Sequence, residues 1–239
     1  MLGRFAGGIL DNDASLVLDQ VISQLEATSQ NSKSTSQPCT WAFAISPRRP
    51  LRFVKSEDEG RVQPDIFCRL LGPGTLGWPH ESQELVIRIW SVDQTLSYRP
   101  ELDAKSIEDW LTLQREPHRV ILRLHFDRAN KGQNGTIFHL QVGGNPIEDQ
   151  KEKSWSCGLP DLPRIPIPPM DLILACELII ANFFQDEFKK LCKDPEWCAV
   201  VRRAEQRTIK RYFDRCSVHL NDTRTKHTLL KTLWNKPLT

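Results

Sequence analysis

Two neighbouring segments of the chain alternate between apolar and polar residues with the two-residue period of a half-buried strand. The first reads RVILRLHFD over residues 119–127, and the second reads TIFHLQVGG over residues 136–144. The connection between them contains an Asn-Gly pair, which is a strong turn signal. The pattern therefore predicts an antiparallel hairpin with one apolar face and one polar face. The polar face carries Arg123, His125, Asp127, His139 and Gln141.

Other segments predict further strands and helices. Strands are expected over residues 41–45, 52–54, 65–71 and 84–92, and a helix that starts after Asn12 or Asp13 is expected over residues 14–25. A short helix is expected over residues 106–113. From residue 170 the pattern becomes helical: residues 170–184 are apolar around nearly the whole circumference, which is typical of a buried helix. An amphipathic helix over residues 195–215 and a last short helix over residues 227–234 follow.

These elements predict an α+β fold. We expect an antiparallel sheet of about five strands, with the N-terminal helix and the C-terminal helices packed on one face. The expected organisation is a single domain with four regions: an N-terminal helix (1–27), a polar linker (28–39), an antiparallel β-rich region (40–169) and a helical region on the sheet (170–239). The helix over residues 170–184 is expected to cover the apolar side of the hairpin, namely Leu122, Leu124, Phe138 and Leu140.

The composition is that of an ordinary soluble domain. The chain has 239 residues, of which 39% are hydrophobic and 26% charged. No apolar run approaches the roughly 20 residues that a bilayer crossing needs, and no secretory signal is recognisable, so a cytoplasmic protein without membrane contact is expected. The seven cysteines lack a Cys-x-x-Cys pair and are interpreted as reduced structural thiols. We expect neither a metal ion nor a cofactor.

Positive charge is concentrated at the C-terminal end. From Glu196 onward there are ten Lys and Arg residues against four Asp and Glu residues, so this end carries +6 and the remainder −4. Arg203, Arg207 and Lys210 share one face at helical spacing. This pattern favours an acidic partner, either a protein subunit or the phosphate backbone of a nucleic acid. The protein partner is favoured because no aromatic residues accompany the cations to stack on bases; a merely solvated helix surface is the alternative.

The polar face of the hairpin holds the candidate residues for chemistry. His125, Asp127 and His139 could act as base, acid and orienting group, or could ligate a divalent metal ion. Arg88 and Arg123 could hold a phosphate group, with Gln141 beside them. The alternative is a polar sheet face whose histidines make ordinary hydrogen bonds. The chain contains no P-loop, no Gly-x-Ser-x-Gly elbow and no His-Glu-x-x-His motif.

One further acidic residue lies in an apolar environment. Glu177 falls within the apolar helical segment, where an unpaired carboxylate is costly. We expect a structural ion pair between Glu177 and Arg164 or an arginine of the sheet.

The order of three segments resembles a known family. LHFD at a strand end, FHLQVGG after a turn, and PRIPIPPMDLILACELIIANFF resemble an uncharacterised prokaryotic family known only as a domain of unknown function. The resemblance covers about residues 119–190 and depends on His139, Gly143, Arg164, Pro166, Asn182 and Phe183; a long insertion between Gly144 and Arg164 departs from the family pattern. Such families occur in mobile-element and phage-defence neighbourhoods.

Two functions remain open at this point. The leading hypothesis is a non-catalytic binding or assembly subunit of a bacterial multi-protein system, as in anti-phage defence, that engages a protein partner or nucleic acid. The alternative is a hydrolase or nuclease that uses His125, Asp127 and His139. Close grouping of these three side chains in a pocket would favour the enzyme.

Overall fold

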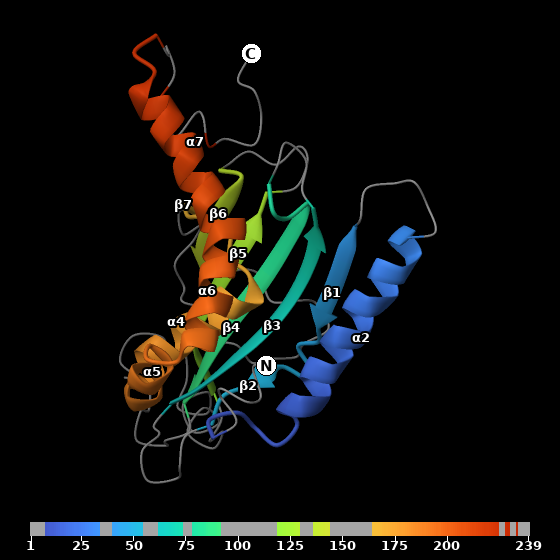
Figure 1. Ribbon diagram of the computed structural model, residues 1–239. Helices are drawn as coiled ribbons and strands as arrows, with labels where there is room; N and C mark the ends of the chain where they lie inside the picture. The colour runs from blue at the N-terminus through green and yellow to red at the C-terminus, as the bar shows by residue number, and fades with distance from the viewer. Residues whose placement is uncertain are drawn as a thin grey trace, which may run out of the picture.

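The computed structural model describes residues 8–33, 40–54, 62–73, 78–91, 119–129, 136–143, 164–224, 228–229 and 233. Over these residues five helices lie against a seven-stranded antiparallel sheet (Figure 1), which confirms the predicted α+β class with more strands than expected. The strands are β1 (Trp41–Ile45), β2 (Leu51–Arg52), β3 (Val62–Gly72), β4 (Ser82–Ser91), β5 (Arg119–Arg128), β6 (Phe138–Val142) and β7 (Ile165–Pro166). The helices are α2 (Ala14–Lys33), α4 (Leu172–Phe183), α5 (Gln185–Leu191), α6 (Pro195–Arg207) and α7 (Ile209–Asn221).

The sheet has the strand order β1-β3-β4-β5-β6-β7, with β2 also paired to β3. Strands β5 and β6 form the predicted antiparallel hairpin, and their register places Asp127 opposite His139 and His125 opposite Gln141. The proline-rich segment adds the short β7, which pairs with β6. The expected helix over residues 106–113 lies outside the described residues.

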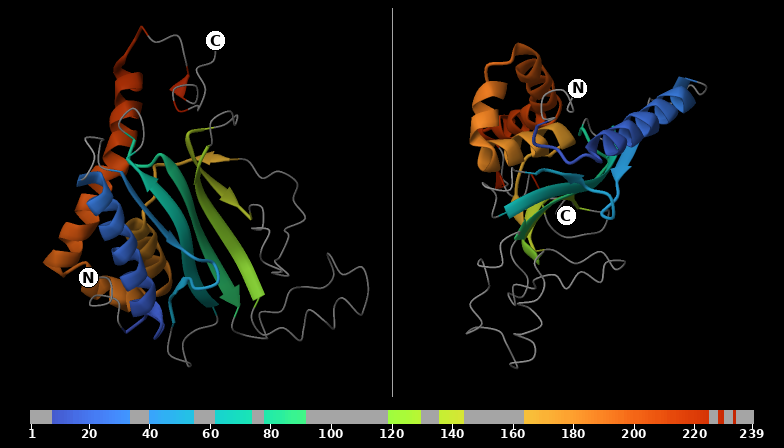
Figure 2. Two further views of the ribbon diagram at one scale, coloured as in Figure 1. Left: turned by 90° about the vertical axis from the view of Figure 1, so that its right-hand side faces the viewer. Right: turned by 90° about the horizontal axis from the view of Figure 1, so that it is seen from below.

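All five helices lie on the same side of the sheet (Figure 2). Helix α2 lies along β1, whereas α4 crosses β3 and carries α6 on its other side. The sheet thus has a helix-covered face and a second face, and successive residues of each strand alternate between them. The predicted polar residues of the hairpin lie on the second face.

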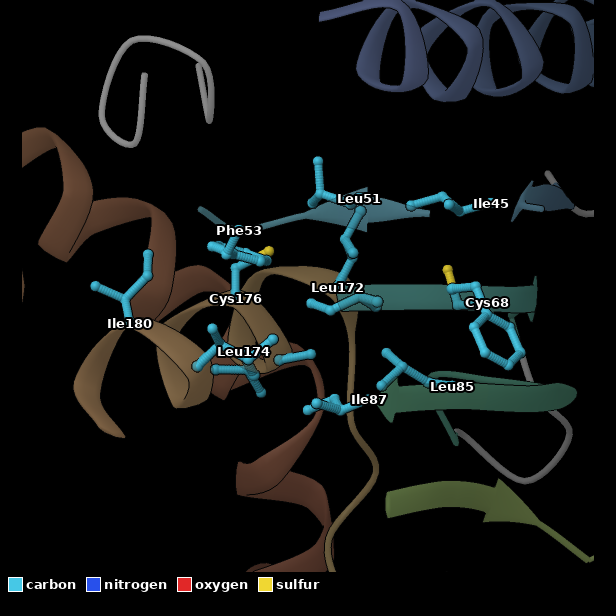
Figure 3. Close-up of a cluster of buried hydrophobic side chains, with 14 of the residues drawn as sticks. Ile45, Leu51, Phe53, Cys68, Leu85, Ile87, Leu172, Leu174, Cys176 and Ile180 are labelled. Atoms are coloured by element: carbon cyan, nitrogen blue, oxygen red, sulfur yellow. The ribbon is translucent and has the colours of Figure 1, made fainter. Parts of the chain in front are cut away.

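The main core joins the helix-covered face to α4 (Figure 3). Leu51, Phe53 and Leu85 of the sheet side and Ile180 of α4 are all fully buried. Cys68 and Cys176 also lie in this core, and burial raises the pKa of the Cys68 thiol to about 12, so it stays protonated and inert. Each fully buried aliphatic or aromatic side chain contributes about 1.5–3 kcal/mol by removal from water.

The hairpin packs against two clusters instead of one. Leu122, Leu124 and Leu140 pack against the main core, to which α4 also contributes. Phe138 instead belongs to a second cluster with Trp78, whose ring lies 5.2 Å away, and with Tyr212 of α7. The first residue of β6 is therefore covered by α7.

The edge strand β1 is capped by a side chain of α2. The amide group of Gln24 accepts a hydrogen bond from the Ala44 N–H (2.7 Å) and donates one to the Ala44 carbonyl (3.1 Å). The side chain thereby satisfies both backbone groups as a further strand would. The exposed edge of a sheet is otherwise a template for pairing with another chain.

Several helix boundaries differ from the predicted ones. Helix α2 runs to Lys33, so the polar segment after residue 27 starts as helix. Helix α4 begins after Asp171, whose side chain accepts from the Leu174 N–H (3.0 Å), and not at residue 170. The prediction of a single helix over residues 195–215 was wrong. The helix is interrupted at Thr208, whose hydroxyl donates to the Ala204 carbonyl (2.7 Å), and α7 starts at Ile209.

Helix α4 is less enclosed than its composition predicts. Half of its residues are buried, while Leu178 is 37% exposed and Asn182 lies at the surface. Glu177 is half-buried beside Glu205, and both burial and that neighbouring charge raise its pKa. Within the described part of the chain Glu177 makes no ion pair, so the prediction of a pair with Arg164 was wrong. The raised pKa of Glu177 favours its uncharged form instead.

Two substitutions on α4 test this packing. Ile180→Ala removes a fully buried side chain and should lower the free energy of unfolding by about 2–5 kcal/mol, because a cavity is left in the core. Leu178→Ala on the same helix removes a side chain that is 37% exposed and should cost less than half as much. Urea unfolding followed by circular dichroism measures both; equal losses would contradict the assigned orientation of α4.

Candidate functional site

The strand register gathers the predicted catalytic residues on the second face of the sheet. Glu84, Asp127 and His139 form one row across β4, β5 and β6, since each is the direct partner of the next. His125 lies in the neighbouring row, with Gln141 as its partner on β6. Side chains of direct cross-strand partners lie about 5 Å apart at Cβ, so the register makes Asp127 and His139 neighbours.

Both histidines are buried and uncharged. His125 is 5% exposed and His139 is 2% exposed. Burial, followed by the charge of Arg123, lowers the pKa of His125 to about 4. Burial and then the charge of Arg164 also lower the pKa of His139. Both rings are therefore neutral at pH 7, the form that accepts a proton or binds a metal ion.

Asp127 is the most perturbed carboxyl group of this face. Burial, together with the nearby Glu84 carboxylate, raises its pKa to about 7, and Arg164 opposes the shift. Its Oδ1 atom is buried without a hydrogen-bond partner, and so is Nε2 of His125. A carboxyl group with a pKa near neutrality can donate or accept a proton, which is the property a general acid or base requires.

The same residues do not form a metal site. Among the residues that the structure describes, no group of three His, Cys, Asp or Glu side chains is placed to hold a metal ion. His125, Asp127 and His139 therefore offer proton transfer or hydrogen bonding, because the diagonal offset between the rows separates the two imidazoles.

Arg88 has a structural role in the sheet. Its guanidinium group donates to both carboxylate oxygens of Asp65, at 2.8 Å each, and both side chains are almost fully buried. Trp90 Nε1 donates to the same carboxylate (2.9 Å), and the guanidinium lies 4.9 Å from the ring centroids of Phe67 and Trp90. These contacts occupy the group that was a candidate for holding phosphate. Arg123, its cross-strand partner on β5, is 2% exposed.

The three basic residues that were predicted to share one helix face lie in different environments. Arg203 is exposed on α6, and Lys210 on α7 pairs with Asp214 at 2.6 Å in solvent. Arg207 instead pairs with the buried Asp171 at 2.6 Å and so ties the end of α6 to the start of α4. Arg203 and Lys210 are available to a partner, whereas Arg207 supports the fold.

Sequence reasoning missed four polar residues that the structure makes important: Asp65, His80, Glu84 and Asp171. Asp171 carries a readable signal, because an Asp three residues before Leu174 at the start of an apolar helix is a typical N-cap. Asp65 and Glu84 alternate onto the second face, but their partners depend on the register. His80 follows a stretch of sequence rich in Gly and Pro, and no periodicity points to it.

Within the described residues, none of the helices combines the length and the apolar character that a membrane crossing needs.

The titration of Asp127 can be tested through stability. The pKa of Asp127 is about 7 in the folded protein against an ordinary value of 3.8, so its contribution to stability is fully present below about pH 4 and is lost as the pH rises to 7. Asp127→Asn removes this loss. The free energy of unfolding of the variant, relative to the unsubstituted protein, should therefore be higher at pH 8 than at pH 4. Urea unfolding at both values measures it; a difference independent of pH would contradict the assignment.

The comparisons with known proteins leave the interpretation to this geometry. No family model matches the chain, and neither a curated protein nor a solved structure does.

Proposed function

We propose that this protein is a non-catalytic binding subunit that engages an acidic protein partner through the surface of α6 and α7. The observation that carries the proposal is the exposure of apolar side chains on α7. The setting that we propose for it is a bacterial multi-protein system.

Helix α7 buries only part of its apolar side. Tyr212 is 9% exposed in the second cluster, next to Trp78 and Phe138. Phe213 is 57% exposed and Leu220 is 70% exposed, and their spacing of seven residues places them on the same side of the helix. The helix also extends beyond the sheet (Figure 1). An amphipathic helix with an uncovered apolar stripe is a common way to present a surface to another protein.

Charge defines the chemistry of the partner. Lys210 and Arg211 are exposed on α7, Arg203 is exposed on α6, and the chain from Glu196 onward carries a net charge of +6. A partner that covers Phe213 and Leu220 must be apolar at its centre, and its rim must be acidic to match these cations. Nucleic acid fits less well, because aliphatic side chains such as Leu220 gain little from a phosphate backbone.

The second face of the sheet fits a structural role in this proposal. On this face Asp65 is paired with Arg88, and burial keeps His125 and His139 neutral. Such groups stabilise a unique packing without taking part in chemistry.

The binding surface is tested by comparing what variants retain from cells. Phe213→Ser with Leu220→Ser should lose a partner that the unsubstituted protein retains, because both side chains leave the interface centre. Arg203→Glu with Lys210→Glu should weaken the same association by charge repulsion. Quantitative mass spectrometry of affinity-purified complexes measures the retained proteins, and thermal melts verify the fold.

Helix α5 provides the matched control. Lys189→Glu with Lys190→Glu reverses two exposed charges whose partners are also on α5, and should retain the partner in full. Retention of the same proteins by the α7 variants would refute the proposal. Association through nucleic acid would appear instead as binding to a 20-base-pair DNA duplex that falls steeply between about 50 and 200 mM salt.

Proton transfer at Asp127 and His139 is the second candidate function, favoured by the perturbed pKa of Asp127 and its unpartnered Oδ1. Because His139 is 2% exposed, His139→Gln is the appropriate variant, since it keeps most of the side-chain volume. Hydrolysis of bis(p-nitrophenyl) phosphate and of p-nitrophenyl acetate by both proteins is the measurement. We expect both the unsubstituted protein and the variant to hydrolyse these substrates at the background rate. Hydrolysis above background by the unsubstituted protein, lost in a correctly folded His139→Gln variant, would establish the enzyme.

A further inference from the structure

The helix-covered face contains a cavity of about 430 Å³ between α2 and the start of α4. Its walls are mainly apolar: they include Ile22 of α2 and Trp41 and Phe43 of β1. His80, Asp171 and Arg207 supply the polar part of the lining. A cavity of this size, apolar with a few polar groups, is typical of small-molecule sites.

His80 is the unsatisfied group of this cavity. Its side chain is completely buried, and neither ring nitrogen has a hydrogen-bond partner. The Trp41 and His80 rings are nearly perpendicular, at 82°, with their centroids 5.5 Å apart, so the aromatic wall contacts the imidazole. Buried polar side-chain atoms are hydrogen-bonded in the large majority of cases, and an unsatisfied one is costly. A partner that enters from the cavity would remove this cost.

The polar groups of the cavity carry no net charge between them. Burial lowers the pKa of His80 to about 4, so the imidazole is neutral at pH 7. Asp171 and Arg207 neutralise each other at 2.6 Å, and Asp171 also caps α4. Neither an anion nor a cation finds an unbalanced charge here, which indicates an uncharged ligand.

The imidazole also indicates the kind of polar group. A neutral imidazole has one N–H donor and one acceptor nitrogen, and neither ring nitrogen of His80 has a hydrogen-bond partner. The acceptor nitrogen is therefore unsatisfied in either tautomer. A ligand satisfies this nitrogen by donating a hydrogen bond, as a hydroxyl group does.

We propose that this cavity binds an uncharged, mainly hydrocarbon alcohol or phenol whose hydroxyl group donates a hydrogen bond to His80. The hydrocarbon part lies between Ile22 of α2 and the rings of Trp41 and Phe43. This site is separate from the α7 surface and does not depend on the partner proposed for it.

Two probes of the same shape test the hydrogen bond. 2-Naphthol carries a donating hydroxyl group, and 2-methoxynaphthalene cannot donate. Isothermal titration calorimetry at pH 7 should show saturable binding of 2-naphthol with a dissociation constant about tenfold lower than that of 2-methoxynaphthalene, the ratio for one net hydrogen bond. Equal affinities in the unsubstituted protein, or no saturable binding of 2-naphthol, would overturn the proposal.

Three variants locate the site. His80→Phe should bind both probes with equal affinity, because the acceptor is gone while the ring remains. Ile22→Trp should abolish binding of both, since Ile22 lines the cavity and is 50% exposed, so the indole can fill the space without disturbing the core. Leu16→Trp on the same helix is the matched control, because Leu16 is 61% exposed and does not line the cavity.

Leu16→Trp should leave both affinities unchanged. Binding lost equally in the Leu16 and Ile22 variants would place the probes elsewhere and overturn the proposal. A His80→Phe protein that keeps the tenfold preference would do the same. If His80→Phe fails to fold, the comparison of the two probes in the unsubstituted protein still decides the question.

Discussion

Asp171 lies where the chain leaves the sheet and enters the helical layer, and its carboxylate has a partner on each side. One oxygen accepts from the Leu174 N–H and starts α4, while the other pairs with Arg207 at the end of α6. Because half of the Arg207 side chain is exposed, the ion pair contributes little energy of its own. Its role is geometric: it sets the start of one helix against the end of another, and the core below depends on that arrangement.

The second constraint is that much of the sheet is buried on its second face as well as its first. On the helix-covered side the apolar residues of β3 and β4 meet α4. On the second side Asp65, Arg88, His125 and His139 are buried, and a buried charge is costly unless it is paired. Asp65 and Arg88 solve this by pairing, and the histidines solve it by remaining neutral. Burial is the largest cause of the perturbed pKa values of His125, Asp127 and His139 on this face.

The alternation of the hairpin was sufficient to predict the pairing of β5 with β6 and the polar side that contains His125, Asp127 and His139. Local periodicity could not show that Glu84 and Asp65 come from other strands to the same face, because pairing between distant strands depends on register. The break at Thr208 also escaped prediction, since the helical period continues through it while the hydroxyl bonds to the preceding turn. The role of Arg207 could not be predicted for the same reason. It was expected on a basic helix face, but it pairs with Asp171, which lies 36 residues earlier in the chain.

The hydrogen bonds between the Gln24 side chain and the Ala44 backbone give α2 a second role besides packing. Helix α2 forms one wall of the cavity and also covers the outer edge of β1 at Ala44, so a fluctuation that lifts the helix exposes this edge. Exposed strand edges lead to association between copies of a chain. Resistance to aggregation should then follow the local opening of α2, as amide hydrogen exchange reports it, more closely than the global stability of the domain. A small molecule that holds α2 on the sheet would act as a solubilising agent for the protein.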